Sequence, residues 1–244
     1  MIFDLVVAAL LSPLLLVQAA YVRSRALALP EPPGGRAGVV GQGAPLRVLI
    51  LGDSSAAGVG VEAQDDALLG QITHRLAGHA TVTFELVAQT GAKTGDVLAW
   101  LDELPSQDYD VVITALGVND VTKLVPLRRW LQQQETLMGR LMNDFGARCV
   151  IVSGVPNLSE FPVLPSPLRW LLGRRAVWLD HYLAPLVDRQ PHCIHVPADM
   201  TLTASNMARD GFHPGPIVYA AWAEMVVAAI LQDPALLDPV AVNA

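Results

Sequence analysis

Residues 46–55 read Leu-Arg-Val-Leu-Ile-Leu-Gly-Asp-Ser-Ser, and this stretch decides the fold. Its first six residues are apolar apart from Arg47, a pattern typical of a strand buried on both faces of a parallel sheet. Gly52 and the polar residues behind it end the strand, because such residues favour turns. Asp53 and Ser54 are therefore expected at the carboxyl end of a buried strand.

On both sides of this strand, apolar runs and segments of helical periodicity follow one another. Further strands are expected at 81–88, 109–116, 148–153 and 193–197, and helices at 65–77, 94–104, 126–145, 167–190 and 216–232. Pro185 is expected to bend or break the helix at 167–190. This alternation predicts an α/β fold, a three-layer α/β/α sandwich with a five-stranded parallel sheet in the flavodoxin-like order 2-1-3-4-5. Ligands bind such sheets beyond the carboxyl ends of the strands.

The composition divides the chain into three parts. Within residues 1–23, the stretch 2–22 is mostly apolar, is about long enough to span a bilayer, and is followed by two arginines. We expect an uncleaved membrane anchor, and the arginines favour the cytoplasmic face. The alternatives are a cleaved signal, with export to the periplasm or secretion, and an ordinary helix packed on the domain. Residues 24–45 are rich in proline and glycine and are expected to be a linker, and 46–244 to form one domain.

Charge and cysteine content restrict the partners of this chain of 244 residues. Its net charge is −7 and it has no basic stripe, so a nucleic-acid partner is not expected. Cys149 and Cys193 lie in predicted strands and are expected to be buried free thiols, with a disulfide as the alternative. His192-Cys193-Ile194-His195 contains metal-binding residue types, but a strand turns His192 and Cys193 to opposite faces. No metal site is therefore expected.

Polar motifs follow four of the predicted strands and should meet at one edge of the sheet. They are Gly52-Asp53-Ser54-Ser55, Gln89-Thr90-Gly91, Gly117-Val118-Asn119-Asp120 and Asp210-Gly211-Phe212-His213. A serine that attacks a carbonyl carbon needs a base, and His213 has a carboxylate three residues before it. We therefore expect Ser54 as nucleophile, His213 as general base and Asp210 as the group that orients the histidine.

Acyl transfer also needs donors for the oxyanion of the tetrahedral intermediate. The backbone N–H groups of Ser54 and Gly91 and the side-chain amide of Asn119 are expected to supply them. Asp120 has no clear catalytic task and is assigned to loop structure. Each motif alone also occurs in ordinary turns and helix caps. Their order, each behind a strand, favours catalysis, and this chemistry needs no metal or organic cofactor.

These blocks resemble the SGNH hydrolases, also called GDSL lipases and esterases. Gly52-Asp53-Ser54 matches the first block, Gly91 the second, Gly117-x-Asn119-Asp120 the third and Asp210-x-x-His213 the fifth. The resemblance spans 46–232 in outline and implies the SGNH hydrolase fold and the same residue roles. The longer run Gly52–Gly60 is also similar to a bacterial branch linked to long-chain N-acyl amino acid biosynthesis.

The expected activity is hydrolysis of carboxylic esters or thioesters with medium to long acyl chains. The apolar segment 155–172 follows the fourth predicted strand, and we expect its side chains to line an acyl groove or to face lipid. The substrate-binding candidates are Phe161, Val163, Leu164, Leu168 and Trp170. The alternative is a loop packed on the core. Carbohydrate O-acetyl esters are the alternative substrates, and a non-enzymatic flavodoxin-like binding module is the alternative class.

Overall fold

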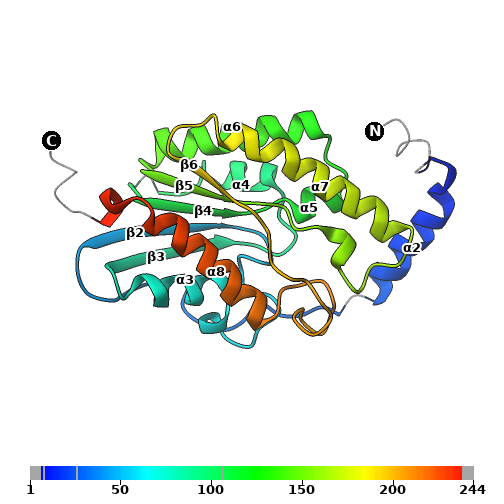
Figure 1. Ribbon diagram of the computed structural model, residues 1–244, viewed down its shortest axis with the longest axis horizontal. Coiled ribbons are helices and arrows are strands. Elements are labelled where there is room, and N and C mark those ends of the chain that lie inside the picture. Colours follow the sequence, from blue (N-terminus) through cyan, green and yellow to red (C-terminus); the bar gives the residue numbers. More distant parts are fainter. Residues whose placement is uncertain (1–6, 8, 26, 106, 238–244) are drawn as a thin grey trace.

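The structure is a computed structural model that describes residues 7, 9–25, 27–105 and 107–237. At its centre lies a sheet with the strand order β1-β3-β2-β4-β5-β6 (Figure 1). Strands β2 to β6 pair in parallel, and β1 pairs antiparallel with β3. The strands are β1 Ala37–Val40, β2 Pro45–Gly52, β3 Thr81–Ala88, β4 Val111–Ala115, β5 Cys149–Ser153 and β6 Cys193–Val196.

Helices cover both faces of the sheet and complete a three-layer sandwich (Figure 1). Helices α4, α6 and α7 contribute to the core on one face, and α3 and α8 to the core on the other. The α-helices are α2 Ser12–Arg25, α3 Leu68–Leu76, α4 Thr94–Trp100, α5 Val118–Thr122, α6 Leu127–Asp144, α7 Leu168–Val187 and α8 Pro216–Leu231. Short 3₁₀ helices are η1 Gln64–Asp66, η2 Leu158–Glu160 and η3 Pro234–Leu237.

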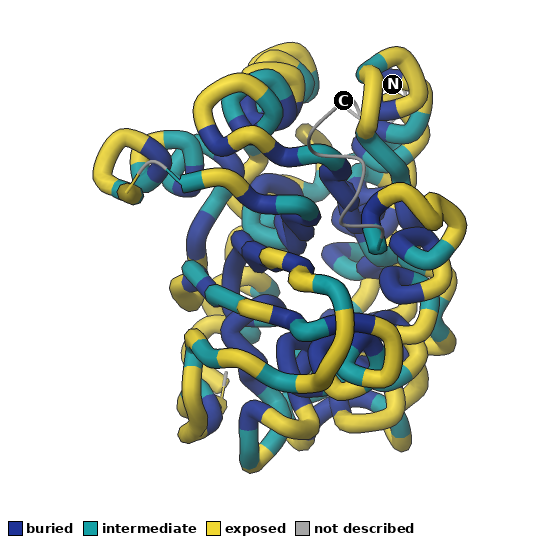
Figure 2. The backbone as a smooth tube through the Cα atoms, turned by 90° about the vertical axis from the view of Figure 1, so that its left-hand side faces the viewer, coloured by how far each residue is buried: buried dark blue, intermediate teal, exposed yellow. Residues whose placement is uncertain are grey.

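Strand β2 shows why an apolar run specifies the middle of this fold. Successive side chains of a strand point to opposite faces. Leu49 and Leu51 enter the core under α6 and α7, whereas Val48 and Ile50 enter the core under α3 and α8, and all four have no exposed surface. Burial of such a side chain contributes about 1.5–3 kcal/mol. Figure 2 shows the result as a buried interior surrounded by exposed turns. The predicted α/β sandwich is confirmed.

The sheet has one more strand than the sequence predicts. Strand β1 lies within residues 24–45, the expected linker, and makes the sheet mixed instead of wholly parallel. It is four residues long and half-exposed, so it lacks the continuous apolar run of a central strand. Gly38 lets β1 lie close to β3, since a Cβ there would come within 2.8 Å of the Phe84 ring. In addition, α7 runs through Pro185 to its end at Val187 without a break.

The expectation of a membrane anchor over 2–22 is wrong, and so is the membrane location derived from it. In the part of the chain that the structure describes, no helix is long and apolar enough to cross a membrane. Within the described part of the chain, helix α2 covers Ser12–Arg25. Its last turn also carries Arg23 and Arg25. Residues 1–6 and 8 of the expected anchor lie outside the described residues.

Helix α2 lies against the outer end of α7 (Figure 1). The Gln18 side chain donates to the Ser166 carbonyl at 2.6 Å and accepts from the Leu168 N–H at 3.0 Å. Leu15 and Val22 pack against the core on that side. A helix packed on the domain was one of the alternatives for this segment.

Candidate active site

Ser54 lies two residues beyond the end of β2, at the carboxyl edge of the sheet. Gly52 allows β2 to pass close to β4 there, because a Cβ at this position would be 2.5 Å from the Ala115 carbonyl oxygen. The Asp53 N–H then donates to the same carbonyl at 3.2 Å. This turn leaves Ser54 largely buried, with 7% of its surface exposed. Among the described residues, no acceptor binds the Ser54 N–H.

The structure brings Ser54, His213 and Asp210 together from distant parts of the sequence. Ser54 Oγ lies 2.9 Å from His213 Nε2. On the other side of the ring, His213 Nδ1 lies 2.6 Å from Asp210 Oδ2. This arrangement places the imidazole so that Nδ1–H donates to the carboxylate and Nε2 can accept the serine proton. It is the constellation that acyl transfer by an activated serine requires.

The Asp210 carboxylate is held by more than the histidine ring. Its Oδ1 accepts from the backbone N–H groups of Phe212 at 2.9 Å and His213 at 3.0 Å. Burial opposes ionisation of Asp210, but the hydrogen bonds from His213 and Phe212 outweigh it, so the pKa of this carboxyl lies below its ordinary value. Asp210 is therefore a carboxylate over the whole neutral range.

Gly60 positions the histidine, a role that no sequence motif indicates. The residue has a φ of +115°, and a Cβ there would lie 2.2 Å from the Pro214 carbonyl oxygen and 3.3 Å from His213 Cβ. The segment behind the nucleophile can therefore press against the histidine loop only if position 60 is glycine. In the sequence, Gly58-Val59-Gly60 resembles a glycine-rich phosphate-binding loop, but no Gly-Lys-Ser/Thr follows it, so that function is excluded. The two glycines were the available signal for a tight backbone contact.

Asn119, the expected oxyanion donor, is tied to the turn of the nucleophile. Its Nδ2 donates to Asp53 Oδ2 at 3.0 Å, which leaves the second N–H of the amide available. Asp53 Oδ1 accepts from the Ser55 N–H at 2.9 Å and from Ser55 Oγ at 2.7 Å. Burial raises the pKa of Asp53, and the bonds from Ser55 and Asn119 offset this in part. Asp53 is a positioning residue that the motif contains but whose task the sequence analysis did not assign.

Asp120 joins the Asn119 loop to the start of α4. Its Oδ2 accepts from the Thr94 N–H at 3.2 Å and from Thr94 Oγ1 at 3.0 Å. The same hydroxyl accepts from Trp130 Nε1 and from Gln134 Nε2, both at 3.1 Å. Burial raises the pKa of Asp120, and the bonds from Thr94 oppose this. The expected structural role of Asp120 agrees with these contacts, because it fixes the loop after β4 to the segment after β3.

Among the described residues, no hydrogen bond connects Gly91 to the triad. The residue is exposed, has a φ of +86° and lines a shallow hollow with Gln89 and Trp100. The segment nevertheless starts beside the nucleophile turn, since the Gln89 N–H donates to the Gly52 carbonyl at 3.3 Å. A Cβ at Gly91 would meet nothing within 4 Å, so the positive φ, and not crowding, favours glycine.

The residues expected to bind substrate lie in different parts of the structure. Phe161 is one of the residues that line a cavity beside Ser54 and His213. Leu164 and Leu168 are buried in the core between the sheet and α7. Trp170 lies on the outer part of α7, 37% exposed, with the Arg174 guanidinium 5.4 Å from its ring centroid. Val163 packs partly buried against the core.

The side chains of His195, Cys149 and Cys193 could also take part in chemistry, and the structure shows the state of each. His195 Nε2 lies 3.1 Å from Asp180 Oδ1, and that oxygen also accepts from the Val155 N–H at 2.9 Å. Cys149 and Cys193 are free thiols, and burial raises the pKa of Cys149 to about 12 and that of Cys193 to about 11. Within the described ranges, no three His, Cys, Asp or Glu side chains are grouped so that they could hold a metal ion.

A mainly parallel α/β sandwich with a hydrogen-bonded serine, histidine and aspartate at the carboxyl edge of its sheet is an arrangement typical of a class of lipases and esterases. Residues 50–221 match the model of the GDSL-like Lipase/Acylhydrolase family, and the chain belongs to this family. No match to a curated protein was found.

Solved structures with a similar fold include several esterases. The lipase Lip_vut3 from a goat rumen metagenome has a TM-score of 0.63 at 18% identity, over 75% of this chain and 97% of that one. A carbohydrate esterase family 2 enzyme with a carbohydrate binding domain from Corynascus thermopiles (Myceliophthora fergusii) has a TM-score of 0.59 at 16% identity, over 86% and 69%. The lipase/acylhydrolase from Enterococcus faecalis has a TM-score of 0.54 at 20% identity, over 77% and 96%. At these identities the likeness extends to the fold alone.

Proposed function

We propose that this protein hydrolyses carboxylic esters or thioesters of medium to long acyl chains through an acyl-Ser54 intermediate. The observation that carries the proposal is the continuous hydrogen-bonded chain from Ser54 Oγ through the His213 ring to Asp210, with distances of 2.9 Å and 2.6 Å. A binding module has no use for a serine hydroxyl aligned with a basic nitrogen in this way. The resemblance to a branch linked to long-chain N-acyl amino acid biosynthesis favours long acyl chains.

In the first half-reaction Ser54 Oγ attacks the carbonyl carbon, and its proton passes to His213 Nε2. The C–O or C–S bond to the leaving group then breaks, and Nε2 returns the proton to that group. In the second half-reaction a water molecule attacks the acyl carbon while Nε2 accepts its proton. The bond to Ser54 Oγ breaks, the acid departs, and Nε2 restores the serine proton. The Asp210 carboxylate stabilises the imidazolium in both halves.

The oxyanion of each tetrahedral intermediate requires donors aimed at one point. The Ser54 N–H and the second N–H of the Asn119 amide are available for this role, and the Gly91 N–H is the third proposed donor. Asp53 keeps the Asn119 amide oriented before substrate arrives, so that no reorganisation is needed during the reaction. Asp120 acts indirectly, because its bonds to Thr94 hold the loops of Gly91 and Asn119 together.

A series of p-nitrophenyl esters from acetate to palmitate, assayed with the full chain below the micelle threshold, tests this function. We expect turnover of the series with kcat/KM that increases from acetate to octanoate. Turnover confined to acetate would favour an O-acetylesterase, and acetylated oligosaccharides would then be the substrates to assay. Absence of turnover of every ester and of acyl thioesters by the folded protein would contradict the proposal.

Replacement of Asn119 by alanine is expected to lower kcat by about 10²–10³-fold with little change in KM, because an oxyanion donor acts mainly in the transition state. Steady-state kinetics on one p-nitrophenyl ester checks this. Asn143→Ala is the matched control, since Asn143 is exposed on α6 and should leave both constants unchanged. An effect confined to KM would place Asn119 in ground-state binding instead.

Replacement of Gly60 by alanine is expected to lower kcat by about 10²-fold, because the added methyl group moves the histidine loop and a displacement of about 1 Å costs this much. The positive φ adds a loss of about 1–3 kcal/mol in the free energy of unfolding, which urea titration measures. Gly139→Ala on α6 has open space around the new Cβ and serves as control, with wild-type kcat. Wild-type kcat in Gly60→Ala would contradict the role assigned to this contact.

A further inference from the structure

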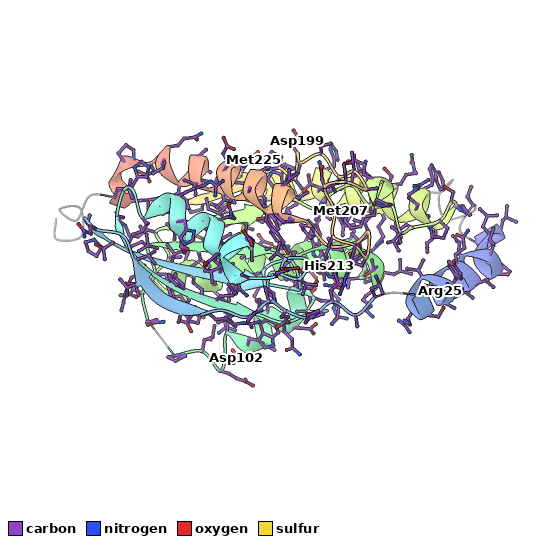
Figure 3. All side chains as sticks on the ribbon, turned by 90° about the horizontal axis from the view of Figure 1, so that it is seen from below. Arg25, Asp102, Asp199, Met207, His213 and Met225 are labelled. Atoms are coloured by element: carbon purple, nitrogen blue, oxygen red, sulfur yellow. The ribbon has the colours of Figure 1, made fainter. Side chains whose placement is uncertain are left out.

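A cavity lies beside the proposed catalytic residues Ser54 and His213. Its free volume is about 50 Å³ as cavity volumes are usually measured, and about 590 Å³ when the open solvent at its mouth and the gaps between its wall atoms are included. Its lining includes Ser54 and His213, the ends of β4 and β5, helix α8 and the segment 198–207. The apolar part of its wall includes Phe161, Met200, Leu202, Met207, Val218 and Trp222. Figure 3 labels Met207 and His213 in the central part of the molecule, on the loop that leads into α8.

The inner part of this cavity offers few hydrogen-bond partners. Besides Asp53, Ser54, Ser55 and His213, the polar side-chain groups in its lining among the described residues are the Ser153 hydroxyl and the Trp222 indole N–H. Ser153 Oγ already accepts from Trp222 Nε1 at 3.2 Å. A sugar placed here would leave hydroxyl groups unpaired, and each unpaired hydroxyl would weaken binding by about tenfold or more. A methylene chain loses nothing and gains roughly fourfold in specificity for each group that is fully buried.

The wall of the cavity can adapt to a chain. Residues 198–206 form neither helix nor strand, and Met207 makes only an isolated bridge with Pro214. Met200 contacts both hydrophobic cores, so it closes the gap between the two layers at the edge of the sheet. Methionine is unbranched and polarisable, and it suits a surface that must follow a flexible apolar ligand.

We infer that this cavity binds the acyl chain of the substrate, with the carbonyl group at Ser54 and the tail directed toward Trp222. The inference rests on the proposed function. It places the acyl site at Met200 and Met207, and not on the surface around Trp170. Trp170 lines a separate groove on the outside of α7, together with Asn157 and Val177, and none of these residues lines the cavity. Leu164 and Leu168 are core residues and do not line the cavity either.

The cavity also sets an upper limit to chain length. Val218 and Trp222 of α8 form part of its wall, and both are buried, with 2% and 7% of their surfaces exposed. A short chain leaves the cavity partly empty, whereas a long one must displace the segment 198–207 or emerge at the mouth. We therefore expect kcat/KM to increase from acetate to octanoate and to fall again toward palmitate.

The test compares kcat/KM for p-nitrophenyl octanoate and acetate in the full-length wild type, Met207→Trp, Met200→Ala and Trp170→Ala. Met207→Trp fills the cavity and should lower the octanoate-to-acetate ratio by at least about tenfold, the equivalent of two displaced methylenes. Met200→Ala enlarges the cavity and should move the preferred chain length upward, a change that misfolding cannot produce. Trp170→Ala should keep the wild-type ratio.

An unchanged ratio in Met207→Trp together with an unchanged optimum in Met200→Ala would overturn the assignment. A lower ratio in Trp170→Ala would place the chain on the surface of α7 instead. If the wild-type protein hydrolysed neither ester, the proposed function would be contradicted. This outcome differs from the results that would overturn the acyl site alone.

Discussion

Ser54→Ala is expected to lower kcat for ester hydrolysis by about 10³–10⁶-fold while the fold persists. The hydroxyl that it removes is the atom 2.9 Å from His213 Nε2, and the acyl-serine intermediate cannot form without it. The remaining rate would come from the oxyanion donors and from substrate binding. Initial rates on p-nitrophenyl octanoate measure the loss, and circular dichroism with urea unfolding measures the fold.

Ser55→Ala is the matched control for this variant. The Ser55 hydroxyl lies one residue away and donates to Asp53 Oδ1 at 2.7 Å, so its loss should affect positioning and cost far less than the loss of Ser54. If the folded Ser54→Ala variant retained a tenth of wild-type turnover while Ser55→Ala was inactive, the nucleophile would be Ser55.

Asp210→Asn is expected to lower kcat by about 10⁴-fold with the fold retained. The amide cannot accept from His213 Nδ1–H through its NH₂ group, so the imidazole turns or adopts the tautomer that carries its proton on Nε2. That nitrogen then cannot accept the proton of Ser54. Steady-state kinetics checks the loss, and Asp188→Asn at the exposed end of α7 serves as control, with turnover near wild type.

The Asp210→Asn substitution should also change how the free energy of unfolding depends on pH. The pKa of Asp210 is lower in the folded protein than its ordinary value, so the hydrogen bonds to the carboxylate stabilise the fold above about pH 4. This contribution is lost as the pH falls through the lowered pKa. The difference in unfolding free energy between wild type and Asp210→Asn should therefore shrink on acidification below pH 4. A constant difference between pH 7 and pH 3 would contradict the ionised state assigned to Asp210.

The parts of this protein that follow from local sequence could be predicted. Strand β2 is recognisable because Val48, Leu49, Ile50 and Leu51 are apolar on both faces, and only a strand between two helical layers buries both. Ser54, Asp210 and His213 could be proposed as a triad because their segments come after strands, and parallel strands end at one edge. The structure places Ser54 within hydrogen-bond distance of His213, as that argument requires.

Features that depend on contacts between distant segments could not be predicted in this way. Strand β1 is short and half-exposed, and only its pairing with β3 reveals it. The task of Gly60 depends on the Pro214 carbonyl, more than 150 residues away in sequence. The cavity wall combines Met200, Met207 and Trp222, and neither a periodicity nor a motif connects them. Hydropathy alone was also a poor guide at the N-terminus, because it does not show that α2 packs beside α7, with Leu15 and Val22 against the core.

The central claim is that catalysis proceeds through an acyl group on Ser54, and trapping that group tests it most directly. The full-length protein is treated with a p-nitrophenyl alkylphosphonate, which leaves a stable phosphonyl group on an activated serine, and the digested product is analysed by mass spectrometry. We expect one equivalent of label on the peptide that contains Ser54, with activity lost in proportion. Full inactivation with the label on another residue, or unchanged activity after the Ser54 peptide is fully labelled, would contradict it.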